Sequence, residues 1–179
     1  GARIVPRGEA NDAVGLDEDV VPWSKLLFPK LSEVHKGIEA KKNAKICFLY
    51  GSQTGNATEI CKNLAAEASE KGYPVEVCAM NEVEPEDVIK PGAVITFVVS
   101  STGDGDAPDN CDTFFTRLKR KAKKEKGEGA VGVQYAVLGL GDQNYSAFMA
   151  VPRQFSQTMD NLGAKCFAKR GECDDTLGL

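Results

Sequence analysis

A short apolar run passes directly into a polar turn at residues 46–57, which read ICFLYGSQTGNA. Residues 46–50 are almost wholly apolar, as is typical of a parallel strand buried on both faces. After Gly51, apolar residues recur at helical spacing, namely Ala57, Ile60, Cys61, Leu64, Ala65 and Ala68. A strand, a glycine-containing turn and a helix in this order predict the opening unit of an α/β fold.

The same alternation continues along the chain. Further strands are predicted over residues 75–80, 93–100, 135–140 and 165–168. Helices are predicted over residues 109–121 and around residues 148–162, and Gly72 ends the first helix. This order predicts a doubly wound parallel sheet of five strands, in which ligands bind beyond the carboxyl ends of the strands.

The first forty-three residues do not follow this alternation. Residues 1–22 contain proline, glycine and acidic residues without a sustained period, which predicts an extended arm. From Trp23 to about Ala40, apolar residues at steps of three and four predict a short amphipathic helix. We therefore expect an N-terminal arm and short helix over residues 1–43, and an α/β domain over residues 44–179.

Length, charge and cysteine usage exclude several classes of protein. The 179 residues suit one domain, and a net charge of −4 disfavours a nucleic-acid partner. No stretch is apolar enough to span a membrane, so we expect no membrane contact by this chain. The chain opens with Gly1, which favours a fragment, and leaves open an endoplasmic-reticulum anchor in the parent protein.

The cysteines also indicate the compartment. All six lie in apolar, periodic segments without a CxxC pair: Cys47, Cys61, Cys78, Cys111, Cys166 and Cys173. This predicts buried free thiols in a reducing, cytoplasmic environment.

The turn after the first strand has the character of an anion site. Residues 51–57, GSQTGNA, contain hydroxyl and amide side chains but no lysine or arginine. Backbone N–H groups at the start of a helix bind anions, and hydroxyls can add donors. The missing GxxxxGK[ST] and GxGxxG patterns argue against nucleoside triphosphate and dinucleotide sites. The alternative is a helix cap rich in serine and threonine.

Two further loops follow predicted strands. Residues 100–110, SSTGDGDAPDN, contain glycines that let a backbone approach a flat ligand, or form an acidic turn that caps the next helix through Asp109. Residues 138–145, LGLGDQNY, place Tyr145 where an aromatic plane is useful for stacking, and Phe148 follows. Near the C-terminus, GECDD adds carboxylates after the fifth strand.

These segments resemble, in order and spacing, the FMN domains of diflavin reductases. That family includes NADPH–cytochrome reductase, the sulfite reductase flavoprotein, the reductase half of nitric oxide synthase and methionine synthase reductase. The resemblance covers residues 45–179 and implies a flavodoxin-like sheet of order 2-1-3-4-5 with helices on both faces. Flavodoxins are themselves a standard example of ligand binding at the switch point of such a sheet.

The resemblance also implies a role for each loop residue. It assigns the FMN phosphate to Ser52, Gln53, Thr54, Gly55, Asn56 and Ala57. It assigns the inner side of the isoalloxazine ring to Ser101, Thr102, Gly103, Asp104 and Gly105. It assigns the outer side to Leu140, Gly141, Asp142 and Tyr145, with Tyr145 stacked on the ring, Phe148 supporting it and Asp175 near the flavin edge. Thr102 stands where the cytochrome reductases have an aromatic residue, which is closer to methionine synthase reductase.

The chemistry therefore belongs to the cofactor, because no acid–base pair, nucleophile or metal cluster is evident. We expect single electrons to pass from an FAD/NADPH module in the parent protein to a haem or other redox acceptor protein with a basic docking face. The Gly103 carbonyl is expected to accept a hydrogen bond from the half-reduced flavin. Asp104, Asp106, Asp142, Asp174 and Asp175 are expected to disfavour the anionic, fully reduced flavin and to steer the acceptor. This oxidoreductase domain would not complete catalysis alone.

Three alternatives stay open from the sequence. The chain could be the flavodoxin-like domain of another multidomain enzyme, such as a tRNA-modifying radical enzyme, or a stand-alone flavodoxin. It could also be a flavodoxin fold that has lost FMN and acts as a binding module. A basic stretch at residues 119–126 is either a docking patch or the solvated end of a helix.

Overall fold

The computed structural model describes residues 14–38, 45–102 and 104–174. Its centre is a parallel sheet in the order β2-β1-β3-β4-β5, which confirms the predicted topology. The strands are β1 (Ile46–Gly51), β2 (Val75–Ala79), β3 (Val94–Ser100), β4 (Gln134–Gly141), β5 (Lys165–Cys166) and β6 (Gly171–Asp174). Both β5 and β6 pair with β4 in parallel.

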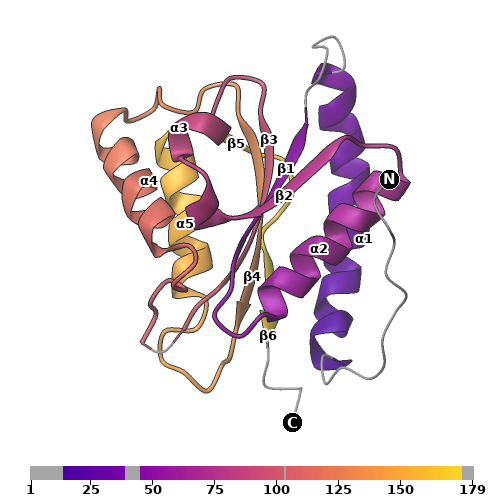
Figure 1. Ribbon diagram of the computed structural model, residues 1–179, viewed down its shortest axis with the longest axis vertical. Coiled ribbons are helices and arrows are strands. Elements are labelled where there is room, and N and C mark those ends of the chain that lie inside the picture. The colour runs from indigo at the N-terminus through magenta and orange to yellow at the C-terminus, as the bar shows by residue number, and fades with distance from the viewer. Residues whose placement is uncertain (1–13, 39–44, 103, 175–179) are drawn as a thin grey trace.

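Helices cover both faces of this sheet, as predicted (Figure 1). One face carries α1 (Val14–Ile38) and α2 (Asn56–Glu70), and the other carries α3 (Pro85–Val88), α4 (Asp112–Lys124) and α5 (Ala150–Asn161). A turn of 3₁₀ helix, η1 (Met80–Glu82), follows β2. Neither η1 nor α3 was predicted, because each is shorter than the window in which a helical period can be recognised.

The two apolar cores follow from the alternation of side chains along the strands. On β3, Val94 and Val98 point to the core under α1 and α2. Ile95, Phe97 and Val99 point to the core under α4 and α5. Because both faces are covered, the strand reads as one continuous apolar run.

The N-terminal helix is longer than predicted. It begins at Val14 and contains Pro22 and Pro29, so the expected extended arm is wrong for residues 14–22, while residues 1–13 lie outside the described residues. A proline inside a helix costs about 3 kcal/mol. Burial of each large apolar side chain contributes about 1.5–3 kcal/mol, and α1 buries Val20, Trp23, Leu27, Phe28 and Leu31. Packing on the sheet therefore outweighs the two prolines.

The predicted fifth strand is divided in two. Cys166 pairs with Tyr135 and Gly171 pairs with Leu138, so residues 167–170 stand opposite residues 136–137. The two extra residues cannot join the ladder, and they separate β5 from β6. As a result, β6 carries the chain to the end of β4 at which ligands are expected.

The six cysteines are free thiols, as predicted. The prediction that they are buried holds for Cys61, Cys111 and Cys173, whereas Cys47 and Cys78 are partly buried and Cys166 is exposed. In the part of the chain that the structure describes, no helix combines the length and the apolar character needed to cross a bilayer.

Candidate functional site

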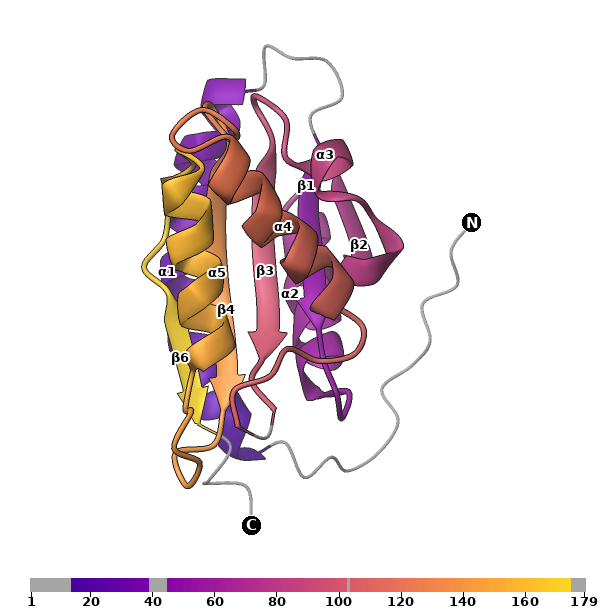
Figure 2. The ribbon, with the colours of Figure 1, turned by 90° about the vertical axis from the view of Figure 1, so that its left-hand side faces the viewer.

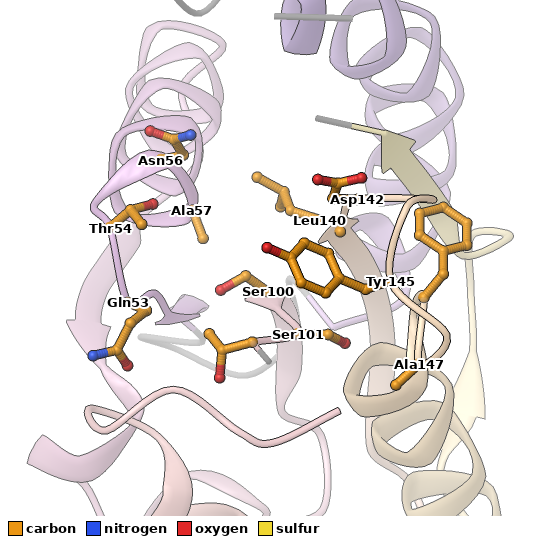
Figure 3. A pocket seen from close by; sticks show the side chains of 13 residues that line it. Gln53, Thr54, Asn56, Ala57, Ser100, Ser101, Leu140, Asp142, Tyr145 and Ala147 are labelled. Carbon is orange, nitrogen blue, oxygen red and sulfur yellow. The ribbon is translucent and has the colours of Figure 1, made fainter. Parts of the chain in front are cut away.

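A pocket of about 360 Å³ lies at the carboxyl ends of β1, β3 and β4. Its walls come from the three predicted loops, and its lining residues are Gln53, Thr54, Asn56, Ala57, Ser100, Ser101, Thr102, Leu140, Gly141, Asp142, Tyr145, Ala147 and Phe148. The volume is within the range of small-molecule sites. Figure 3 shows the side chains of the first loop and of the third loop facing each other across the pocket.

The first loop turns into α2 through Gly55, which has a φ of 108°. A residue with a Cβ would be strained in this left-handed conformation. Helix α2 has no side-chain cap, so the first N–H groups of the helix are not satisfied within it. Those groups and the polar side chains of Thr54 and Asn56 lie at the pocket wall. None of the described lining residues is a lysine or arginine.

The first and second loops are fastened to each other. The Gln53 amide donates to the Asp109 carboxylate at 3.0 Å, and the Asp109 N–H donates back to Gln53 Oε1 at 3.1 Å. The Ser52 N–H donates to Asn110 Oδ1 at 2.8 Å, and Ser52 Oγ accepts from the Gly55 N–H at 3.0 Å. Three hydrogen bonds therefore hold the first loop to the second loop, and one closes the first loop on itself.

Asn81 anchors the far end of the second loop. Its side-chain amide donates to the Asp109 carbonyl at 2.7 Å and to the Asp112 carboxylate at 2.9 Å. Hydrogen bonds from Asn81 and Thr113 hold the pKa of Asp112 below its ordinary value. Sequence reasoning missed Asn81, because it lies after a different strand and no local pattern connects it to the loop.

The second loop forms a closed turn. Thr102 and Asp106 exchange backbone hydrogen bonds of 3.0 and 2.9 Å, and the Thr102 hydroxyl donates to the Asp106 carbonyl at 3.1 Å. Ser101 Oγ accepts from the Val151 N–H at 3.1 Å, which ties this loop to the start of α5. Asp104 and Asp106 are exposed, while Gly103 lies outside the described residues.

The third loop presents an aromatic ring to the pocket. Tyr145 is 58% exposed, and Figure 3 shows its side chain reaching into the pocket. The Asp142 carboxylate accepts from the Asn144 N–H at 2.7 Å, and the Asp142 carbonyl accepts from the Tyr145 N–H at 3.1 Å. Phe148 lies against the backbone of Gly141, where an added Cβ would be 3.2 Å from its ring.

The charges around the pocket are divided. The Arg153 guanidinium lies 5.9 Å from the centre of the Phe148 ring and pairs with Glu172 at 3.1 Å. Hydrogen bonds from Arg153, and also from Arg170, hold the pKa of Glu172 below its ordinary value. Arg153 and Arg170 therefore share the single carboxylate of Glu172, whereas Asp104, Asp106 and Asp109 are exposed on the second loop.

Most of the predicted site residues meet in this pocket. Eleven of them line it: Gln53, Thr54, Asn56, Ala57, Ser101, Thr102, Leu140, Gly141, Asp142, Tyr145 and Phe148. Ser52 and Gly55 shape the first loop from behind, and Gly105 packs against Ala147 and Ala150 on the second. Asp104 is exposed and does not line the pocket. Gly103 and Asp175 lie outside the described residues.

Two lining residues were not predicted. Ser100 is the last residue of β3, and Ala147 lies between the predicted Tyr145 and Phe148. Ser100 lies within the segment 100–110 that indicated the site, and Ala147 would have been included if the segment 138–145 had been extended to Phe148.

The part of the chain that forms the pocket is similar to known proteins. The family model described as flavodoxin matches residues 48–178. Methionine synthase reductase of Caenorhabditis elegans is 40% identical over 130 residues, which are 73% of this chain and 19% of that protein. NADPH-dependent diflavin oxidoreductase 1 of Arabidopsis thaliana is 33% identical over 135 residues, which are 75% of this chain and 21% of that protein. The chain thus spans about a fifth of the length of these relatives.

Solved structures show the same fold. A flavodoxin from Streptococcus pneumonia superposes with a TM-score of 0.62 at 26% identity, covering 73% of this chain and 85% of that one. A flavodoxin from Pseudomonas aeruginosa, at 21% identity, gives a TM-score of 0.61 and covers 74% and 85% of the two chains.

Proposed function

Because the chain belongs to the flavodoxin family and its relatives are diflavin reductases, we propose that it is the FMN domain of such a reductase. In this role it receives electrons from an FAD/NADPH module of the parent protein and passes them singly to a redox acceptor protein. The observation that carries the proposal is one pocket with a cation-free anion site at one end and an exposed tyrosine at the other.

The residues at the first end fit a phosphate. Uncapped N–H groups of α2 and the side chains of Thr54 and Asn56 supply donors without a cation. A phosphate monoester held in this way is bound by directed hydrogen bonds and by the helix dipole. We assign the FMN phosphate to residues 52–57, with Ser52 and Gly55 shaping the loop.

The residues at the second end fit a flat aromatic ring. Tyr145 offers a ring face, Leu140 adds an apolar side chain, and Gly141 has no side chain to obstruct a flat ligand. Thr102, whose hydroxyl donates to the Asp106 carbonyl, also lines the pocket. We assign stacking to Tyr145 and support of the loop to Phe148. Because Thr102 is not aromatic, we expect the flavin ring to be stacked on one face only.

FMN supplies the one-electron chemistry when it is bound, and the chain would hold it in the open pocket at the edge of the sheet. The exposed carboxylates of Asp104, Asp106 and Asp109 lie on the second loop, which forms one wall of the pocket. They would favour an acceptor with a basic docking face, with an association rate that falls as ionic strength rises. Six free thiols favour a reducing, cytoplasmic compartment.

The test is a titration of the purified chain with FMN, followed by flavin fluorescence. We expect one FMN per chain, quenched on binding. Stepwise anaerobic reduction of the complex should then proceed in two separate one-electron steps in the absorption spectrum. Absence of FMN binding would overturn the proposal and favour a binding module that has lost the cofactor. Binding with reduction in a single two-electron step would keep the site but reject the role of single-electron carrier.

A further inference from the structure

Helix α1 lies outside the segment matched by the flavodoxin family model, which begins at residue 48. Its first turns nevertheless lie beside the ends of β4 and β6, at the same end of the sheet as the pocket (Figures 1 and 2). Three contacts join α1 to β6 and the chain leading into it, and they lead toward the third loop.

The first contacts fix α1 to β6 and to the chain that leads into it. Trp23 Nε1–H donates to the Lys169 carbonyl at 2.9 Å. Gly171 lies so close to Trp23 that an added Cβ would be 2.6 Å from the indole ring. The Asp19 carboxylate accepts from the Asp174 N–H at 3.1 Å. Burial and this carboxylate together raise the pKa of the Cys173 thiol to about 12.

The next contact leads from β6 into the pocket loop. The Asp174 carboxylate accepts from the Gln143 N–H at 3.1 Å. Gln143 directly follows Asp142, and the Asp142 carboxylate and carbonyl hold Asn144 and Tyr145. Gln143, Asn144 and Tyr145 are all exposed, so the loop has little packing to fix its position.

We propose that Asp19 is a positioning residue for the flavin site, acting through Asp174 and Gln143 to hold the loop that carries Tyr145. The inference rests on the proposed function for its consequence, which is FMN affinity. The connection itself is a property of the protein without cofactor. Asp19 does not line the pocket. Because it accepts from the Asp174 N–H and the Asp174 carboxylate accepts from the Gln143 N–H, we expect its effect on the site to pass through Asp174.

The first test measures amide hydrogen exchange of the full chain without FMN. In Asp19→Ala, the Gln143 amide should exchange about three- to tenfold faster than in the wild type, because its acceptor on Asp174 is no longer held in place. Asp19→Asn retains an oxygen acceptor and should stay within about twofold of the wild type. Glu33→Ala, which removes a carboxylate from the exposed part of α1, is the matched control and should leave Gln143 unchanged.

The second test is a double-mutant cycle on the dissociation constant of FMN. Asp19→Ala should weaken binding about three- to tenfold, and Asp174→Ala about tenfold. If Asp19 acts only through the Asp174 carboxylate, the double variant should bind as Asp174→Ala does. Effects that multiply, to about thirty- to a hundredfold, would overturn the proposed relay.

The two tests separate this inference from the proposed function. A wild type that does not bind FMN rejects the proposed function, while the exchange of Gln143 still decides whether Asp19 holds the loop. A wild type that binds FMN, with an Asp19→Ala variant unchanged in both exchange and affinity, rejects the inference and keeps the function.

Discussion

The two ends of the pocket are held in place in different ways. At the α2 end, the first loop is braced by reciprocal hydrogen bonds between Gln53 and Asp109 and by the contact of Ser52 with Asn110. At the Tyr145 end, the loop is exposed and is fixed through Asp174 to a helix outside the family match. Both loops lie within the matched segment, but only the loop that carries Tyr145 is connected to a helix that lies outside it.

This difference follows from what each end has to do. A phosphate is held by several directed donors at a helix terminus, so its loop needs one fixed geometry. A stacked ring needs only an aromatic side chain at stacking distance, so the loop that carries Tyr145 can be supported by residues that do not line the pocket. The contributions of the phosphate and of the ring to FMN affinity should therefore respond to different substitutions.

The largest effect is expected from Trp23→Ala, which removes the main contact of α1 with the chain around β6. Trp23 is 4% exposed, and truncation of a buried tryptophan costs about 3–5 kcal/mol of unfolding free energy. Urea unfolding measures this loss. Hydrogen exchange should rise at Gln143 more than at Gln53. An equal rise at both sites would mean that α1 supports the whole domain without preference. Trp23→Phe serves as the milder variant if the alanine variant does not fold.

Thr54→Asp should act on the α2 end alone. Two unit charges about 4 Å apart repel by about 4 kcal/mol at an effective dielectric constant of about 20, less where water screens them. Because Thr54 is exposed, we expect FMN affinity to fall by about a hundredfold, or about 2.7 kcal/mol. Riboflavin, which has no phosphate, should bind as it does to the wild type. Thr54→Asn is the uncharged control, and equal losses for FMN and riboflavin would contradict the assignment.

Tyr145→Ala should act on the other end. Stacking of a planar base on an aromatic side chain contributes about 1–3 kcal/mol, so we expect FMN affinity to fall by about five- to a hundredfold. Riboflavin should lose affinity by the same factor, in contrast to Thr54→Asp. Tyr145→Phe keeps the ring and should bind as the wild type does. Fluorescence titration with both flavins measures the contrast, which disappears if Tyr145 does not contact the ring.

The smallest effect concerns Glu172, which pairs with Arg153 behind the third loop. Its pKa is lower in the folded protein than the ordinary value of 4.5. The ion pair therefore stabilises the fold above about pH 4.5, and this contribution is lost as the pH falls through the folded pKa. Thermal unfolding from about pH 6 to about pH 3 should show a steeper loss for the wild type than for Glu172→Gln, by less than about 1 kcal/mol because the pair is partly exposed. Parallel curves would show that Glu172 does not contribute.

The sequence by itself determined the order of strands and helices and the loops that meet at the pocket. Both follow from local signals: apolar runs such as residues 94–99 predict buried strands, and glycines with hydroxyl residues mark the turn at residues 51–57. In a parallel sheet the carboxyl ends of the strands lie at one edge, so the topology alone brings those loops together.

Only the tertiary structure decided the start of α1, the division of the last strand and the link from Asp19 to Gln143. Prolines at 22 and 29 argue locally against a helix, but burial of Trp23 and Leu27 on the sheet outweighs them. The two extra residues between β5 and β6 depend on the register with β4. Asp19 and Asp174 are 155 positions apart, and no local pattern connects them; their contact exists because both elements pack at the same end of one sheet.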